Sequence, residues 1–468
     1  MDDELRYLDA TEQAQLVANG QVSSVELVEA AIERLEALNP TLNAVVHLDL
    51  ERARDRAAAA SPEHSAHPFA GVPFLMKDLV AHEAGMPFHE GNVHLRDLGW
   101  TTSTDQVLAE RFRAAGLISL GRTNVPEFGM RPVCEPEAYG PTNNPWNLAH
   151  SPGGSTGGGA AAVAAGIVPI AHANDVGGSI RAPASHCGLV GLKPSRGRST
   201  QAPDFFDAMG GLNEELVVTR SVRDTAAVLD AVCSRPVAGD WYPTWPASPS
   251  YVGDAATHPG HLRVGFLARS DAVEVHHDVA DTVRSIAAEL SRLGHDVTEA
   301  HPAALDEDMG AFTLPHYTAG IAWIVDEHWP RQIGHAIPDD EMEPATLFLR
   351  ELGRSVTGAG LLAARELAQS WTRRLASWWD DHDVLVCPVV PTPPPRTGAD
   401  HDDGHLISFC APFNISGQPA VAVPGAVVEG LPIGVQLIAN HGREDILIRL
   451  AAQLETATGW LDRHPPIA

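Results

Sequence analysis

Apolar side chains recur at helical spacing near the N-terminus of the chain. Within segment 23–38 they lie three and four positions apart, and the first four residues have the spacing of a capping box. This pattern predicts a helix that stops at Asn39 and Pro40. A shorter amphipathic helix is expected over 11–19, so we interpret residues 1–65 as an N-terminal helical segment.

Further along, short apolar runs alternate with amphipathic segments. Strands are predicted over 71–78, 117–120, 262–267, 296–299 and 383–391, and helices over 104–115, 278–293, 300–380 and 445–458. Such alternation is typical of an α/β fold. We therefore expect one domain over 1–468, with a twisted mixed β-sheet flanked by helices. Its parts are a glycine-rich core (71–200), a variable substrate-side region (200–380) and a C-terminal core segment (381–468).

Two glycine-rich turns, Gly153–Gly158 and Asp175–Ser179, lie either side of an alanine-rich helix and an apolar strand. Glycines at this density let the backbone N–H groups approach another molecule. Each turn is predicted to open a helix, whose free N–H groups favour a developing anion. The serines of the two turns, Ser155 and Ser179, suggest a nucleophile with a helper hydroxyl.

These turns, together with Lys77 in the apolar run 71–78, resemble the signature of the amidase signature family of amide hydrolases. The resemblance covers essentially the whole chain and is densest over 71–200. It implies an amidase signature domain, and an enzyme that converts a carboxylic amide into a carboxylate plus ammonia or an amine. It implies no cofactor and no metal.

The resemblance also implies roles for individual residues. Ser179 would attack the amide carbonyl and form an acyl-enzyme, Ser155 would relay its proton, and neutral Lys77 would accept it. The peptide bond of the relay serine is expected to be cis. The oxyanion is expected to be held by the backbone N–H groups of Val176, Gly177, Gly178 and Ser179. Gly129 and Met130 are expected to contact the substrate from a loop, and Asp175 and Arg181 are expected to support the site.

Lysine usage supports the role of Lys77. Of 32 basic residues only Lys77 and Lys193 are lysines. Arginine cannot lose its proton in a protein, whereas a buried lysine can, so a retained lysine in an apolar run indicates acid–base chemistry. Asp78 is the nearest partner in sequence for the Lys77 ammonium, although neighbours on a strand point to opposite faces. Lys193 fits a functional role and a role in holding a loop equally well.

Three residues depart from the usual signature: Thr156, Asn174 and Val176. Thr156 keeps a hydroxyl and is expected to be tolerated. Asn174 and Val176 border the catalytic turn, where we expect them to shape substrate choice. The sequence around them is similar to that of amidases of the nylon-oligomer type, which suggests linear or cyclic aliphatic amides as substrates.

The net charge and the cysteine usage limit which binding partners and which cell compartment are expected. A formal net charge of −28 argues against nucleic acid and anionic membranes, and leaves a small-molecule amide as the expected partner. Five unpatterned cysteines and the lack of an apolar h-region or long apolar run indicate a cytoplasmic protein. The sequence leaves the oligomeric state open, with a homodimer among the options.

Other functions remain as alternatives. The G-x-S-x-G pattern around Ser155 fits the nucleophile elbow of an α/β-hydrolase-like esterase. A glutamine-dependent amidotransferase of the A type, acting in tRNA amidation, would share the fold, and a binding protein with a relic site is the last option. A metal site is not expected, because His89, Glu90 and His94 miss the H-E-x-x-H spacing and His276–Asp278 should open a surface helix.

Overall fold

The computed structural model describes residues 2–60, 67–205, 209–233, 235–240, 242 and 245–467. An 11-stranded sheet runs through them in the order β1-β3-β2-β4-β6-β5-β10-β11-β9-β7-β8. The strands are β1 (Val45–Leu48), β2 (Pro73–Lys77), β3 (Ile118–Thr123), β4 (Ile170–Asp175), β5 (Val190–Lys193), β6 (Glu214–Thr219), β7 (Arg263–Phe266), β8 (Asp296–Glu299), β9 (Val384–Pro388), β10 (Ala420–Val428) and β11 (Leu431–Ala439).

The sheet is mixed, as predicted. Strand β2 runs parallel to β3 and β4, and β7 runs parallel to β8 and β9, whereas the strands between these two groups pair antiparallel. The second half of the chain therefore extends the sheet begun by the first half, which confirms a single α/β domain.

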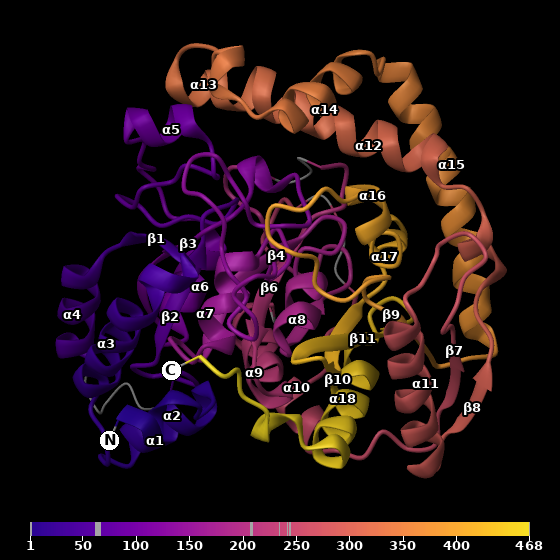
Figure 1. The fold of residues 1–468 in the computed structure, drawn as a ribbon, viewed down its shortest axis with the longest axis horizontal. Coiled ribbons are helices and arrows are strands. Elements are labelled where there is room, and N and C mark those ends of the chain that lie inside the picture. The colour runs from indigo at the N-terminus through magenta and orange to yellow at the C-terminus, as the bar shows by residue number, and fades with distance from the viewer. Residues whose placement is uncertain are drawn as a thin grey trace.

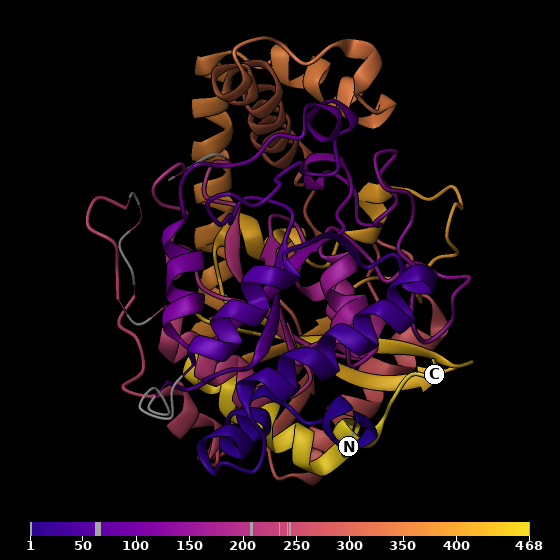
Figure 2. The same cartoon turned by 90° about the vertical axis from the view of Figure 1, so that its left-hand side faces the viewer.

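Helices flank this sheet (Figures 1 and 2). They are α1 (Asp2–Arg6), α2 (Ala10–Ala18), α3 (Ser24–Leu42), α4 (Leu50–Ala59), α5 (Val93–Leu98), α6 (Val107–Ala114), α7 (Gly157–Ala164), α8 (Arg181–Cys187), α9 (Val222–Val232), α10 (Tyr251–Ala255), α11 (His277–Arg292), α12 (Gly310–Trp323), α13 (Trp329–Ile333), α14 (Pro344–Arg354), α15 (Gly358–Ala376), α16 (Asp403–Leu406), α17 (Ala411–Ser416) and α18 (Glu444–Thr458). Short 3-10 or π turns are η2 (Glu127–Gly129), η3 (Ala303–Asp306), η4 (Ile324–His328), η5 (Asp339–Glu341), η6 (Ser377–Asp380) and η7 (Trp460–Asp462). Among the described residues, no helix is long and apolar enough to cross a membrane.

The core has two parts. The larger cluster of buried apolar side chains joins the sheet to α3, α7, α9, α11 and α18. A second cluster lies beneath α12–α15, which form the orange arch at the top of Figures 1 and 2. Trp329 and Trp371 are wholly buried in this second cluster. The helical character predicted for 300–380 is confirmed.

Two N-terminal predictions need correction. Helix α3 begins with the predicted capping box at Ser23 but continues through Pro40 to Leu42. A proline removes only one backbone hydrogen bond, and the helix ends instead at Asn43, whose φ of 50° is left-handed. The N-terminal segment is also not wholly helical, because β1 pairs with β3 at one edge of the sheet. Residues 61–66 of that segment lie outside the described residues.

Candidate active site

The site forms where parallel strands end side by side. Strands β2 and β4 are paired, with Phe74 opposite Ile170 and Leu75 opposite Ala171, so their carboxyl ends meet at one edge of the sheet. Lys77 is the last residue of β2, and Asn174 and Asp175 close β4. The glycine-rich turns before α7 and α8 bring the two serines to the same edge.

Lys77 is wholly buried, and its amine is surrounded by hydroxyl and carbonyl oxygens. Its Nζ lies 2.7 Å from Ser155 Oγ and 2.9 Å from Thr156 Oγ1, and it also contacts Asn174 Oδ1. Burial lowers the pKa of the Lys77 ammonium to about 7, because desolvation disfavours the charged form. A large fraction of this lysine is therefore neutral at neutral pH, as a general base requires.

Asp78 does not serve as the partner of Lys77. Its carboxylate accepts a hydrogen bond from Arg122 Nε at 2.9 Å, in a pair with both side chains buried. The side chains of Lys77, at the end of β2, and of Asp78, directly after it, thus point to opposite faces, as extended backbone requires. Lys77 is left with neutral partners, and this keeps its pKa low.

The first turn holds Ser155 in a closely packed position. The Gly154–Ser155 peptide bond is cis, which confirms the expectation from the family resemblance. Gly154 must lack a side chain, because a Cβ there would lie 2.6 Å from the backbone N of Val133. Ser155 is almost fully buried and faces both Lys77 and the cavity.

The second turn is held by a buried ion pair. Arg181 donates through Nε and Nη2 to the Asp175 carboxylate, both at 3.0 Å. The charge of Arg181 holds the pKa of Asp175 well below its usual range, although burial alone would raise it. Asn414 and Gln436 accept further hydrogen bonds from Arg181. The pair thus supports the turn, as the family resemblance implies for both residues.

One expected oxyanion donor is already engaged. The N–H of Gly178, expected to help hold the oxyanion, donates to Asp175 Oδ1 at 2.7 Å in this structure. Gly178 is needed for another reason, since its φ is +140° and a Cβ would lie 2.8 Å from Cys410 Cβ. In the described part of the chain, the N–H groups of Val176, Gly177 and Ser179 have no protein acceptor.

A cavity opens beside these groups. Ser179, which is partly exposed, lines it together with Ser155, Asn174 and Val176. The remaining lining residues are Leu79, Val80, Glu90, Phe128, Gly129, Met130, Gln201, Phe205, Met209, Asn213, Tyr317, Ile321, Ile324 and His328. Gly129 and Met130 are therefore placed at the cavity, as expected. No hydrogen bond joins the Ser155 and Ser179 hydroxyls within the described ranges.

The tryptophans of 300–380, all of which the structure describes, do not line this cavity. Trp329 and Trp371 fill the second core cluster, and α12 supplies Tyr317 and Ile321 to the cavity wall instead. Lys193 is also outside the cavity. Its Nζ donates to the Pro194 carbonyl at 2.7 Å, which fits the loop-holding interpretation.

The nucleophile-elbow alternative for Ser155 lacks its structural context. An elbow follows directly on a buried strand, but residues 145–154 are irregular and contain no strand. Of the two serines, Ser155 is also the buried one, and its Oγ faces the Lys77 amine. Ser179 carries the more exposed of the two serine hydroxyls.

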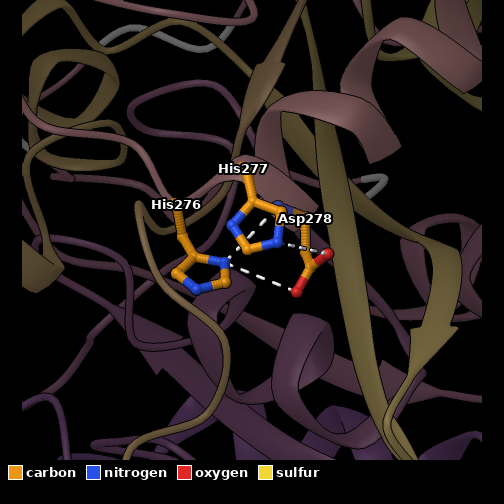
Figure 3. A group of neighbouring side chains, drawn as sticks. All are labelled: His276, His277 and Asp278. Atoms are coloured by element: carbon orange, nitrogen blue, oxygen red, sulfur yellow. Dashed lines mark hydrogen bonds and ion pairs between the residues drawn. The ribbon is translucent and has the colours of Figure 1, made fainter.

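His276, His277 and Asp278 are the one group in the described residues whose ligand atoms lie close enough for a metal ion, within 4.8 Å of one another (Figure 3). His276 is the N-cap of α11, and its ring accepts from the Asp278 N–H at 3.4 Å. Both histidines are exposed on the surface. The three residues open a surface helix, as predicted, and lie outside the cavity.

The sequence does not reveal the full role of several cavity residues. It indicates Asn174 only as a specificity feature, but the side chain of this residue touches the Lys77 amine. It indicates Glu90 only through an incomplete metal motif, whereas this buried carboxyl lines the cavity and accepts from Trp329 Nε1 at 2.9 Å. Asn213 gives no local signal at all. Its place in the wall depends on the pairing of β4 with β6, which no short motif encodes.

Comparisons with known proteins agree with this site. Residues 26–448 match the family model described as Amidase. The chain is 39% identical to the 6-aminohexanoate-cyclic-dimer hydrolase of Pseudomonas sp. (strain NK87) and 40% identical to that of Paenarthrobacter ureafaciens, covering 98% of this chain and 97% of each relative.

Solved structures of amidases are also similar to this chain. A 6-aminohexanoate cyclic dimer hydrolase complexed with substrate superposes with a TM-score of 0.94 at 37% identity, covering 99% of both chains. A bacterial aryl acylamidase of the amidase signature family gives a TM-score of 0.87 at 26% identity, over 98% of both chains. The chain thus belongs to the amidase signature family, and it is an amidase, a hydrolase of amide C–N bonds.

Proposed function

We propose that this amidase works through an acyl-enzyme on Ser179, with Ser155 as proton relay and Lys77 as base. The observation that carries the proposal is the buried Lys77 amine, 2.7 Å from Ser155 Oγ, behind a cavity that Ser179 also lines. A serine hydroxyl is a weak nucleophile at neutral pH and needs an adjacent base. An amine with a pKa near 7 can accept the proton through the relay.

The partners of Lys77 orient the base. A neutral amine has two N–H donors and one lone pair. Thr156 Oγ1 and Asn174 Oδ1 can accept the two N–H groups, which directs the lone pair at the Ser155 hydroxyl. Asn174, which departs from the usual signature, therefore serves here as an acceptor for the Lys77 amine.

In the acylation step, Ser179 Oγ attacks the amide carbon while its proton passes through Ser155 to Lys77. The tetrahedral oxyanion is held by the free N–H groups of Val176, Gly177 and Ser179, each worth roughly 3 kcal/mol in the barrier. Collapse breaks the C–N bond, and the Lys77 ammonium returns its proton through Ser155 to the leaving nitrogen. Water then attacks the ester by the same relay and releases the carboxylate.

The cavity favours an uncharged aliphatic amide. Its lining in the described chain includes no arginine or lysine, and Glu90 is its single carboxyl. Burial lowers the pKa of His328 to about 4, so this ring is neutral at pH 7. Because two relatives are named as hydrolases of the 6-aminohexanoate cyclic dimer, we infer linear or cyclic aliphatic amides as the substrate class.

Glutamine is a less suitable substrate for this lining. Its α-carboxylate would need a cationic partner, which the described cavity residues do not provide. A glutamyl-tRNA(Gln) amidotransferase chain from Thermotoga maritima superposes with a TM-score of 0.80 at 22% identity, a likeness of fold alone. Glutaminase activity is therefore an outcome to test against.

The experiment is labelling with a serine-directed fluorophosphonate, followed by intact mass and peptide mapping, alongside turnover of 6-aminohexanoate cyclic dimer, hexanamide and glutamine. We expect a single adduct on Ser179 and hydrolysis of the first two compounds. An adduct on Ser155 would restore the elbow mechanism. No adduct on the folded protein, or cleavage of glutamine alone, would refute the proposal.

A further inference from the structure

A row of buried polar side chains crosses the sheet beside the catalytic lysine. Asn174 of β4 lies opposite Glu215 of β6, and side chains of directly paired residues share one face of a sheet. Asn213 lies two residues before Glu215 and therefore on that same face. Its Nδ2 donates to Glu215 Oε1 at 3.2 Å. Asn174 and Asn213 are 1% and 4% exposed, and both line the cavity.

Each of these two carboxamides has one end fixed and one end free. Asn174 Oδ1 faces the Lys77 amine, and its Nδ2 has no partner within the described residues. Asn213 Nδ2 is held by Glu215, and its Oδ1 likewise has no partner there. A buried polar atom without a partner costs about 1–3 kcal/mol, and in a cavity wall a bound ligand can supply that partner.

The free atoms are of opposite kind, one donor and one acceptor. Because Asn174 is paired with Glu215, Asn174 and Asn213 are diagonal neighbours across adjacent antiparallel strands. Such neighbours lie about 7–8 Å apart, which leaves room for one amide group between the two side chains. A secondary amide offers the matching pair, since its carbonyl accepts and its N–H donates. Both asparagines are uncharged, as is an amide.

We propose that Asn174 and Asn213 form a subsite for a second, non-scissile amide of the substrate. Asn174 Nδ2 donates to the carbonyl of this amide, and Asn213 Oδ1 accepts from its N–H. The enzyme is thereby selective for cyclic or linear molecules that carry two amides joined by an aliphatic chain. This inference rests on the proposed function, because it assumes that the first amide is held at Ser179.

The test measures binding in a Ser179→Ala background, so that turnover plays no part. Two probes are compared by calorimetry: N-acetyl-6-aminohexanamide, and a monoamide of the same chain length in which methylenes replace the second amide. Adding Asn213→Leu, of similar size but apolar, is expected to weaken diamide binding at least tenfold more than monoamide binding. Equal losses for both probes, or no loss, would overturn the subsite.

A conservative variant guards against misfolding. Asn213→Asp keeps an acceptor oxygen, and burial raises the pKa of Glu215 to about 8, so Glu215 can donate to the introduced carboxyl at pH 7. We expect this variant to recover most of the preference for the diamide. If Asn213→Asp and Asn213→Leu lose the preference alike, the acceptor role is wrong.

The two proposals fail in different ways. If the wild-type protein is labelled at Ser179 and hydrolyses both probes, but the Asn213 variants keep the wild-type ratio of diamide to monoamide binding, only the subsite is refuted. If the wild-type protein is neither labelled nor active on either probe, the proposed function fails and the subsite fails with it. Labelling of Asn213→Leu with Ser179 intact checks that the variant keeps a folded site.

Discussion

At the scale of single residues, the protonation of Lys77 controls the proposed chemistry. Asp78, the residue that follows it, is instead paired with Arg122, and the contacts of the Lys77 amine are with Ser155, Thr156 and Asn174. The energetic cost of burying an ammonium is therefore not offset by an adjacent negative charge. The same isolation that lowers its pKa makes it a base.

A pH dependence follows from this environment. The base acts in its neutral form, and burial lowers its pKa to about 7. Below that pH the fraction of neutral lysine falls, so kcat/KM should decrease about tenfold for each further pH unit and level off above about pH 8. The measurement is kcat/KM on an uncharged amide between pH 5 and 9. A flat profile, or retained activity in Lys77→Met, would exclude Lys77 as the base.

Asp175 holds the second glycine-rich turn through its contacts with Arg181 and the Gly178 N–H. Replacing it by asparagine leaves Arg181 as an unpaired buried charge and weakens the bond to the Gly178 N–H. Loss of one partner from a buried pair costs about 3–5 kcal/mol. We expect Asp175→Asn to lower the free energy of unfolding by that amount, and kcat/KM by roughly 100-fold through displacement of the turn.

Urea unfolding and steady-state kinetics measure both effects. The matched control is Asp281→Asn, which removes the same charge from an exposed pair with Arg284 and should change the free energy of unfolding by less than about 1 kcal/mol. Equal stability losses in the two variants would show that the Asp175 pair does not hold the turn.

At the scale of elements, one close helix contact shapes the cavity wall. Helices α12 and α14 cross where Gly353 meets the backbone of Thr318, and a Cβ on Gly353 would lie only 2.0 Å from the Thr318 carbonyl oxygen. Tyr317 and Ile321, on the same helix as Thr318, line the cavity. The position of α12, and with it one cavity wall, therefore depends on a glycine far from the catalytic turn in sequence.

Gly353→Ala should separate the two helices. We expect a stability loss of about 1–3 kcal/mol from overpacking, together with a raised KM and a smaller change in kcat, because α12 holds substrate-side residues and no catalytic group. Thermal unfolding and steady-state kinetics measure these effects.

Gly358→Ala serves as the control, since a Cβ at this start of α15 meets nothing within 4 Å. It should leave both quantities near their wild-type values. A stability loss in Gly358→Ala as large as in Gly353→Ala would contradict the steric argument.

Most elements with clear periodicity could be predicted from the sequence, and those fixed by distant contacts could not. The helix α11 and the strand β8 follow from their own apolar patterns and end close to the predicted residues. Strand β1 has only four residues and follows closely on the long helix α3, so it does not stand out from the helical pattern, and it exists because β3 offers a partner edge. Likewise Lys77, Ser155 and Ser179 lie in recognisable motifs, whereas Asn213 enters the site through strand pairing.

At the scale of the whole molecule, one sheet joins strands from both halves of the chain, and the chain carries a large excess of negative charge. The two ends of the chain also meet, where Arg6 Nη2 donates to the Ile467 carbonyl at 3.0 Å. Both core clusters pack on this one sheet, so electrostatic repulsion at the surface lowers the stability of the fold as a whole. The net charge of −28 produces such repulsion.

Salt should therefore stabilise this protein. Like charges repel in the compact state, and raising the ionic strength from 0.01 M to 0.1 M shortens the screening length from about 30 Å to about 10 Å. Exposed ion pairs such as Arg284–Asp281 weaken at the same time, but each contributes at most about 1 kcal/mol, whereas the repulsion acts between all the excess carboxylates. We expect Tm at pH 7 to rise by about 1–3 °C when sodium chloride is raised over this range. A neutral osmolyte at equal osmolality separates screening from solute exclusion. A fall in Tm would mean that the ion pairs outweigh the net charge.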